Sequence, residues 1–161
     1  MLFREMREDD IWDVVRLVRK NYDEAVRQEL PRVIVDFLKD ELTVKYTRQY
    51  LNNYRRKMFI LDDDGIVGTI ALQFPRRLDE LPELRSLAIY PTRQGYGSIL
   101  MENLEEYVRN EGFRGISVGP NPAAEIFYEK KGYETYGHYE REFPTNPRKK
   151  LNGPLMFKRL I

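Results

Sequence analysis

Apolar residues recur at two different spacings along the chain, and the change of spacing separates helical from strand-forming segments. In the first third, Ile11, Val14, Val15 and Val18 fall three or four positions apart, which is the spacing of one face of an α-helix. From Lys57 the pattern changes to short runs rich in β-branched and aromatic residues, such as KMFIL and IVGTIALQF. The chain is therefore expected to combine helices with a sheet.

Residues that start and stop helices divide the N-terminal part further. Leu2–Met6 is a short segment typical of a first strand. Asp10 stands three residues before Asp13, which is a pattern of helix N-caps. A second helical region is expected from about residue 32 to residue 54, after Pro31, and its less regular apolar positions indicate a break into two pieces.

Turn residues separate the remaining strands. KMFIL and IVGTIALQF are joined by DDDG, whose Asp-Gly is typical of a hairpin turn. LRSLAIY is expected to be the next strand of this sheet, and GISVG a short buried one. The last two strands are expected in ETYGHYEREF and PLMFKRLI, on either side of a loop, PTNPRKKLNG.

Two further helices carry their own end signals. Leu100, Leu104 and Val108 give the run after IYPTRQGYG one apolar face, and Gly112 is placed to end that helix. In NPAAEIFYEKKGY, Asn121 is an N-cap residue, a proline follows it, and a glycine ends the helix.

The element order is β-α-α-β-β-β-α-β-α-β-β, with about seven strands and four helices. The strand–helix–strand passage from Leu84 to Val118 predicts a right-handed parallel crossover inside an otherwise antiparallel sheet. The sequence thus predicts one α/β (α+β) domain over residues 1–161.

Composition limits the classes of protein to which the chain can belong. At 161 residues, with 42% apolar and 33% charged residues, the chain has the balance of a soluble globular domain. No apolar run approaches the roughly 18 residues of a membrane span, and the N-terminus does not resemble a signal peptide. Lys plus Arg number 27 against 26 acidic residues, so net charge favours neither nucleic acid nor a membrane as partner. We expect a cytoplasmic protein.

The absence of cysteine and the single histidine limit the kinds of catalytic and metal site that the chain can form. The chain has no cysteine, which excludes disulfides, a thiol nucleophile and thiolate metal sites, and fits a reducing compartment. With one histidine, a zinc site would need carboxylates almost alone, so no metal site is expected. His138, in YGHYERE, is expected to be a partly exposed strand residue. Chemistry must then come from carboxylates, tyrosines, hydroxyls and backbone amides.

One turn between a strand and a helix has the composition of an anion-binding loop. A helix N-terminus leaves about four backbone N–H groups unpaired and carries roughly half a positive charge. Glycines in front of it let an anionic oxygen approach those amides closely. The residues expected to form such a phosphate cradle are Arg93, Gln94, Gly95, Tyr96, Gly97 and Ser98.

Other interpretations of this turn stay open on the glycines alone. Gly95 and Gly97 also suit a tight strand-to-helix turn without any ligand, because so short a motif is weak evidence. A Walker A loop requires a lysine before Ser98 and has none here, which argues against NTP hydrolysis. A dinucleotide fingerprint requires a third glycine at position 100, which is leucine.

The wider segment LRSLAIYPTRQGYGSILMENLEEYVRNEGFRGISVGPNPAAEIFYEKKGYE resembles the core of the GNAT superfamily of N-acetyltransferases. GYGSILM is similar to that family's Q/R-x-x-G-x-G/A loop, which binds the pyrophosphate of acetyl-CoA. NPAAEIFYEKKGY is similar to its second block, which ends in Tyr-Glu-Lys-x-Gly-Phe/Tyr. Where the family has Gln or Arg, this chain has Thr92, and its loop is about two residues shorter. The cradle is therefore expected to rest on backbone amides.

The resemblance implies a fold and a cosubstrate. In this family a central parallel pair of strands splays apart, and the pantetheine arm of acetyl-CoA lies between them like an added strand. Here the resemblance assigns that place to Leu87, Ala88 and Ile89 on one side and to residues 116–119 on the other. It also implies that Asn121 binds the pantetheine arm, a role compatible with its N-cap position.

The resemblance also implies two catalytic side chains. An amine attacks the acetyl carbonyl directly, without a covalent enzyme intermediate, and two protons must move. Tyr128 matches the family's tyrosine that protonates the leaving thiolate and contacts the cosubstrate; core packing beside Phe127 is its alternative role. Glu83 opens a strand where some members carry a catalytic glutamate, so it is the candidate base, directly or through a water. A solvated loop carboxylate is the alternative there.

These observations favour an acetyl-CoA-dependent N-acetyltransferase acting on a primary amine of a small molecule or a protein. A non-catalytic acyl-CoA-binding module on the same fold is the alternative, and a nucleotide-binding domain is a third. The acceptor is not identified by the sequence; residues 22–31 and 143–154 are expected to enclose it, and Tyr22, Tyr46 and Tyr90 are candidates to line its groove. The sequence is compatible with a homodimer.

Overall fold

The computed structural model describes residues 1–161 and contains seven strands and five α-helices. The strands are β1 (Leu2–Glu5), β2 (Arg56–Asp62), β3 (Ile66–Gln73), β4 (Glu83–Ile89), β5 (Gly115–Val118), β6 (Glu134–Phe143) and β7 (Lys149–Arg159). The α-helices are α1 (Ile11–Glu24), α2 (Arg32–Glu41), α3 (Val44–Arg48), α4 (Tyr96–Asn110) and α5 (Glu125–Lys130). Short 3-10 turns cover Glu8–Asp10, Val26–Gln28 and Pro122–Ala124.

All strands belong to one sheet, in the order β1-β2-β3-β4-β5-β7-β6. Every neighbouring pair is antiparallel except β4 and β5, which are parallel and are connected through α4. This confirms the predicted fold class and the predicted crossover. It also places the parallel pair in the middle of the sheet.

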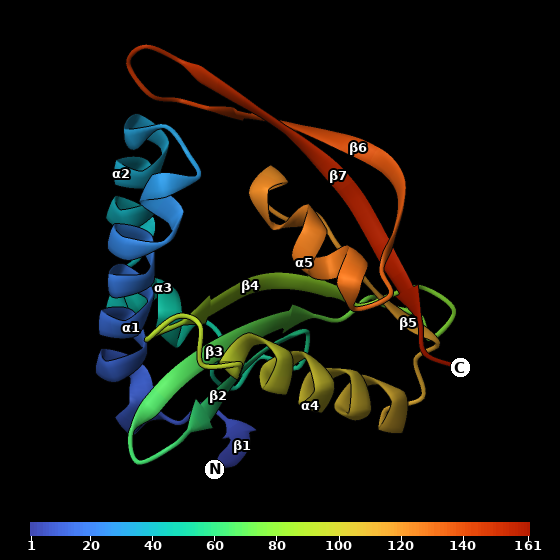
Figure 1. Ribbon diagram of the computed structural model, residues 1–161. Coiled ribbons are helices and arrows are strands. Elements are labelled where there is room, and N and C mark those ends of the chain that lie inside the picture. Colours follow the sequence, from blue (N-terminus) through green and yellow to red (C-terminus); the bar gives the residue numbers. More distant parts are fainter.

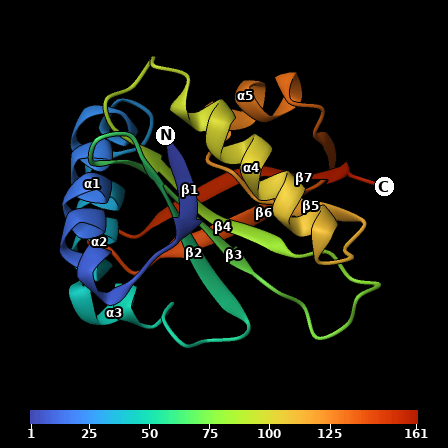
Figure 2. The same cartoon turned by 90° about the horizontal axis from the view of Figure 1, so that it is seen from below.

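Helices cover both faces of the sheet, because its central strands alternate between two cores. Phe59 and Leu61 of β2 belong to the core under α4 and α5, whereas Met58 and Ile60 belong to the core under α1. Successive side chains of a strand point to opposite faces, so an unbroken apolar run can serve both cores. Figures 1 and 2 show α1, α2 and α3 gathered on one side of the molecule, apart from α4 and α5.

The predicted break in the second helical region is confirmed, but the region ends earlier than expected. Leu42 is extended after α2, and the hydroxyl of Thr43 accepts a hydrogen bond from the backbone of Tyr46 at 3.0 Å, which caps α3. Residues 49–54 form turns, with Asn52 in the left-handed region at a φ of 56°. The prediction of helix up to residue 54 was wrong.

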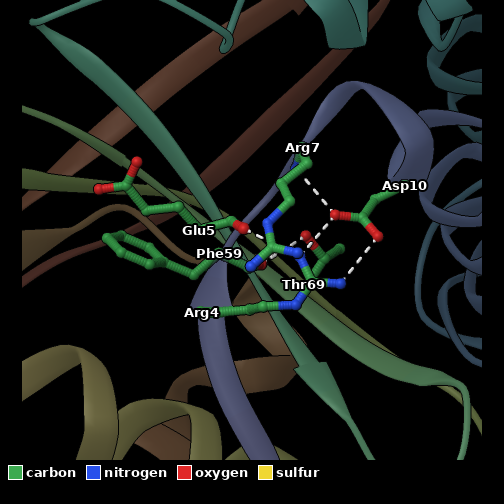
Figure 3. A network of polar contacts seen from close by, with 6 residues as sticks. All are labelled: Arg4, Glu5, Arg7, Asp10, Phe59 and Thr69. Carbon is green, nitrogen blue, oxygen red and sulfur yellow. Dashed lines mark hydrogen bonds and ion pairs between the residues drawn. The ribbon is translucent and has the colours of Figure 1, made fainter.

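Asp10 does not cap α1, contrary to the sequence pattern. It lies in the preceding 3-10 turn and makes no side-chain hydrogen bond to the first turn of the helix. Figure 3 shows its carboxylate between two donors: the Arg4 guanidinium binds both oxygens, at 2.7 and 2.9 Å, and the Arg7 backbone amide donates at 2.7 Å. The Asp10 side chain therefore forms an ion pair with Arg4 of β1 and does not cap α1.

The last strand begins at Lys149, five residues before the predicted strand segment. Its early part pairs with β6, and Lys150 forms a cross-strand ion pair with Glu140 at 3.2 Å. Neither charge nor apolar alternation marks KKLNG as a strand, and its strand conformation comes from pairing with the end of β6, where Lys149 lies opposite Phe143. The resulting long hairpin reaches across to α2, where Phe143 meets Phe37 edge to face at 5.7 Å (Figure 1).

None of the helices combines the length and the apolar character needed to cross a lipid bilayer.

Candidate functional site

The parallel strands β4 and β5 separate after two paired positions. Glu83 is paired with Ser117 and Leu84 with Val118, and β5 ends there. From Arg85 to Ile89, β4 continues along β3 without a strand on its other edge. Unpaired strand edges present backbone N–H and C=O groups that an extended ligand can use.

A β-bulge lies where the separation begins. Across from β3, Ser86 pairs with Ala71 and Leu84 with Leu72, so Arg85 is the extra residue of β4. The bulge reverses the alternation of the strand, and Leu84 and Leu87 therefore both contact the core under α4 and α5. Arg85 is turned out of that core and is exposed.

A cavity of about 400 Å³, here called the cleft, fills the space between the diverging strands. Its walls come from β4, from the segment after β5, from the end of α1 and from the facing sides of α4 and α5. Its lining includes Asn21, Glu29, Leu87, Ile89, Gly97, Val118, Gly119, Asn121, Phe127 and Tyr128. More than half of the lining is hydrophobic, which suits a mainly apolar ligand arm.

The N-terminus of α4 lies at the cleft. Gly95 precedes the helix in the left-handed region, at a φ of 78°, and Arg93 is also left-handed, at 63°. No backbone carbonyl or side chain accepts a hydrogen bond from the amides of Tyr96, Gly97 or Ser98; the first helical bond runs from Ile99 to Gly95. These amides are therefore free to bind an anion.

Gly97 lies against the Phe127 ring of α5. It is buried, it lines the cleft, and a Cβ atom there would lie 3.4 Å from the Phe127 ring. Gly95, in contrast, has open space around it and is required for its backbone angle. The two glycines of the motif thus have different physical roles.

A cation that the sequence analysis did not select lies beside this turn. Lys131 donates a hydrogen bond from Nζ to the Ser98 hydroxyl at 2.6 Å and stands over the Phe127 ring, 4.8 Å from its centre. The signal was present in EKKGY, where two lysines precede the glycine, but only the tertiary fold shows which lysine turns towards α4. Arg93 and Gln94 are exposed and lie outside the cleft.

Tyr128 combines burial with an unused hydroxyl. The residue is 4% exposed and lines the cleft, and its ring packs edge to face against Phe127 and Tyr133. Its hydroxyl makes no hydrogen bond to another protein group. Burial raises the pKa of this phenol well above its usual value of 10, so it stays protonated at neutral pH.

Asn121 and Glu29 form a polar contact across the cleft. Asn121 accepts a hydrogen bond from the Ala123 backbone at 3.3 Å, which confirms its capping role, and donates to the Glu29 carboxylate at 2.7 Å. Partial burial raises the pKa of Glu29. Asn21, buried in α1, donates to the Ile89 carbonyl at 3.0 Å. Sequence patterns did not single out Glu29 or Asn21, because Asn21 in α1 and Glu29 in the turn after Val26–Gln28 are both distant in the sequence from β4 and α5.

A second cavity, of about 380 Å³ and here called the side cavity, adjoins the cleft. Leu84, Arg85, Gly119 and Asn121 line both. Glu83 lines the side cavity and pairs with Arg85, at 3.2 Å between the carboxylate and guanidinium. The structure therefore brings Tyr128 and Glu83 to neighbouring cavities, and not to a single one.

Several residues selected from the sequence lie elsewhere. Ala88 packs into the core under α1 and does not line the cleft. The Tyr96 side chain turns to the β2–β3 hairpin, where its hydroxyl donates to Asp63 at 3.1 Å. His138 is exposed on β6 and lines neither cavity, as expected. Tyr22, Tyr46 and Tyr90 also line neither cavity.

The structure brings together no group of three or more carboxylate or imidazole side chains that could hold a metal ion.

Comparison with known proteins finds similarity to acetyltransferases. A model of the acetyltransferase (GNAT) family matches residues 15–133. An uncharacterized acetyltransferase of Streptococcus pyogenes serotype M3 is 46% identical over 79 residues, which make up 48% of this chain and 55% of that protein. Another from the same species is 46% identical over 79 residues, or 48% and 53% of the two chains. The chain thus spans about half the length of the curated relatives it matches.

Solved structures share the fold across nearly the whole chain. The PaiA N-acetyltransferase of Thermoplasma acidophilum, in complex with coenzyme A, has a TM-score of 0.76 at 14% identity and covers 98% of each chain. The aminoglycoside 6'-N-acetyltransferase of Enterococcus faecium has a TM-score of 0.71 at 19% identity, over 100% of this chain and 98% of the other. The ribosomal-protein-S18-alanine N-acetyltransferase of Escherichia coli has 0.72 at 16%, over 99% and 93%.

Proposed function

Because the chain belongs to the acetyltransferase (GNAT) family, we propose that it transfers the acetyl group of acetyl-CoA to a primary amine. The observation that carries the proposal is the cleft itself. It brings together a free edge of β4 and Gly97, whose backbone amide is unpaired at the start of α4, in one mainly apolar cavity.

The cleft fits the chemistry of acetyl-CoA in two places. The amides of Tyr96, Gly97 and Ser98 offer hydrogen-bond donors and a positive helix end to the diphosphate, with Lys131 and Arg93 as nearby cations. The edge of β4 from Arg85 to Ile89 offers main-chain groups to the amides of the pantetheine arm. Asn121 would bind the arm from the opposite wall, in exchange for its contact with Glu29.

The proposed reaction is a direct attack. The amine nitrogen forms a bond to the acetyl carbonyl carbon, the carbon–sulfur bond breaks, and the electron pair leaves with sulfur. The ammonium must first lose a proton to a base, and the thiolate gains one from the Tyr128 hydroxyl. A phenol whose pKa is raised by burial is protonated over the whole physiological range, as a proton donor must be.

Two carboxylates are candidates for the base. Glu83 lines the side cavity and would act directly or through an ordered water. Glu29 lines the cleft, and partial burial raises the pKa of its carboxylate, which favours its acceptance of a proton. We favour Glu83 for an amine bound in the side cavity, and Glu29 is the competing assignment.

The proposal is tested by following free thiol from acetyl-CoA in the presence of a library of primary amines. A transferase releases thiol in step with one class of amine and forms an N-acetylated product of matching mass. Acyl-CoA analogues with longer chains, added to the same assay, determine the acyl preference.

A non-catalytic acyl-CoA-binding module on the same fold is the alternative. It would bind coenzyme A in calorimetry and release no thiol above the rate without protein, whichever amine is present. Absence of both binding and turnover would contradict the assignment of the cleft.

A further inference from the structure

We propose that the acceptor is a small amphoteric amine, namely an amino acid with an apolar side chain, held in the side cavity with its carboxylate on Arg141. This inference rests on the proposed function. It adds the class of acceptor, which neither the family nor the relatives' names determine.

Arg141 is an unpaired cation at the side cavity. Its neighbours on β6, Glu140 and Glu142, pair with Lys150 and Arg148. Arg141 points to the opposite face of the hairpin, because side chains alternate along a strand. There its guanidinium forms no ion pair and stacks on the Phe143 ring, 4.5 Å from the ring centre. Such stacking fixes the plane of the guanidinium and leaves its edge free for a carboxylate.

The other charges of the side cavity balance each other. Glu83 and Arg85 pair at 3.2 Å, so the lining has one excess positive charge, on Arg141. The positive charge of Arg141 would repel a polycationic acceptor. An amino acid would match the lining at both ends, with its ammonium near Glu83 and its carboxylate at Arg141.

The remaining walls of the side cavity are apolar. Leu30 and Leu38 come from the α1–α2 side, and Phe143, Leu151 and Leu155 come from the β6–β7 hairpin. A volume of about 380 Å³ suits a small molecule with a side chain such as that of leucine or phenylalanine. Apolar contacts would hold the side chain, while the two charged ends determine which way the molecule lies.

The test compares amines that differ only in the anionic group. Leucine, leucinamide and 3-methylbutylamine form one series, and phenylalanine, phenylalaninamide and phenethylamine form another. Rates are compared at equal concentrations of unprotonated amine. For the wild-type protein we expect kcat/KM to be at least about 10-fold higher for one of the two amino acids than for its amide and its decarboxylated form.

Arg141→Gln should lower kcat/KM for that amino acid by about 30-fold, mainly through KM, and leave the analogues without a carboxylate within about 2-fold. Arg141→Lys should retain part of the preference, because it keeps the charge and loses the planar fork. Arg148→Gln is the matched control, since Arg148 lies on the same hairpin outside the cavity. Calorimetry with coenzyme A and a thermal melt would verify that each variant is folded.

Several results would overturn the inference. If the amides or the decarboxylated amines are acetylated as well as the amino acids, or if Arg141→Gln lowers both classes equally, the carboxylate is not recognised by Arg141. If phosphoethanolamine is preferred to both amino acids, the anion is a phosphate and the assigned class is wrong. These outcomes leave acetyl transfer intact. If no amine of the library releases thiol, the proposed function itself fails, and this inference fails with it.

Discussion

Tyr128 lies at the cleft with its ring enclosed by aromatic neighbours and its hydroxyl without a protein partner. Arg55 Nε is the only fully buried side-chain polar atom without a partner, so the Tyr128 hydroxyl keeps some accessible surface, through which a ligand in the cleft can reach it. The motif FYEKKGY located the residue in the sequence. Its burial and the open position of its hydroxyl depend on packing in three dimensions, so only the structure reveals them.

Removal of that hydroxyl gives the most direct test at the residue scale. Tyr128→Phe should lower kcat by about 100-fold, because general acid catalysis contributes that order of magnitude, and should leave the affinity for coenzyme A within about 2-fold. Tyr133→Phe is the matched control: its ring packs against Tyr128, but its hydroxyl donates to Glu105 away from the cleft. Equal losses in the two variants would argue for a packing role.

Two isosteric substitutions, Glu83→Gln and Glu29→Gln, distinguish the two candidates for the general base. If Glu83 is the base, Glu83→Gln should lower kcat/KM by about 100-fold at neutral pH, and the loss should shrink at high pH as free amine becomes abundant. Glu29→Gln should then cost less than about 5-fold, through its contact with Asn121. The opposite ranking in pH–rate profiles of the two variants would assign the base to Glu29.

At the element scale, the turn from β4 into α4 shows how a short motif becomes a site. Gly95 provides the left-handed backbone and Gly97 the close approach of α5, so the start of the helix stays uncovered. Sequence reasoning identified the glycine pattern correctly. It assigned no role to the β-bulge at Arg85, because a bulge depends on the register with β3 and leaves no local signal.

A larger side chain at position 97 should reduce the space in the cleft between α4 and α5. Gly97→Val would press against Phe127 and narrow the cleft, and we expect the affinity for coenzyme A to fall by about 10-fold. Gly112, at the other end of α4 with a φ of 92°, provides the control. Gly112→Ala should lower the melting temperature through backbone strain and leave coenzyme A binding unchanged. Calorimetric titration of both variants makes the comparison.

The junction of β1 with α1 depends on the pair between Arg4 and Asp10 (Figure 3). The Arg4 guanidinium is the main cause that lowers the pKa of Asp10 below its usual 3.8. The folded state therefore gains stability that is fully present above about pH 4 and is lost as the pH falls through the lower folded value.

Asp10→Asn should accordingly reduce the free energy of unfolding by about 2 kcal/mol at pH 7, because it leaves the Arg4 guanidinium without its carboxylate. The difference from the wild type should shrink as the pH falls below 3.8 towards the lower pKa of the folded state, where Asp10 itself becomes protonated. Urea denaturation at pH 7, 5 and 3 measures this. A constant difference across that range would contradict the lowered pKa.

For the whole molecule, binding and stability are coupled. The cleft is built from α1, β4, the segment after β5, α4 and α5, so a ligand that fills it connects elements from both faces of the sheet. Such a ligand stabilises only the folded state, and its effect grows with its concentration relative to Kd.

Coenzyme A at about 100 times its Kd should therefore add roughly 2.7 kcal/mol of stability and raise Tm by about 5 °C or more. ATP at the same concentration should raise Tm by less than about 1 °C, because it lacks the pantetheine arm that the β4 edge and the apolar walls suit. Thermal melts with each ligand decide between the acyl-CoA site and a nucleotide-binding domain. Equal protection by ATP would favour the latter.

The sequence by itself determined the order of the elements, the parallel crossover and the glycine turn before α4, because each depends on local periodicity, turn chemistry or a contiguous motif. Only the tertiary structure decided where β4 and β5 separate, that Asp10 pairs with Arg4, that β7 begins at Lys149, and that Glu29 and Arg141 reach the two cavities. The separation of the strands and the positions of Glu29 and Arg141 arise from contacts between residues far apart in the chain. The Arg4–Asp10 pair and the start of β7 involve residues closer in the sequence, but they too depend on geometry that no local pattern records.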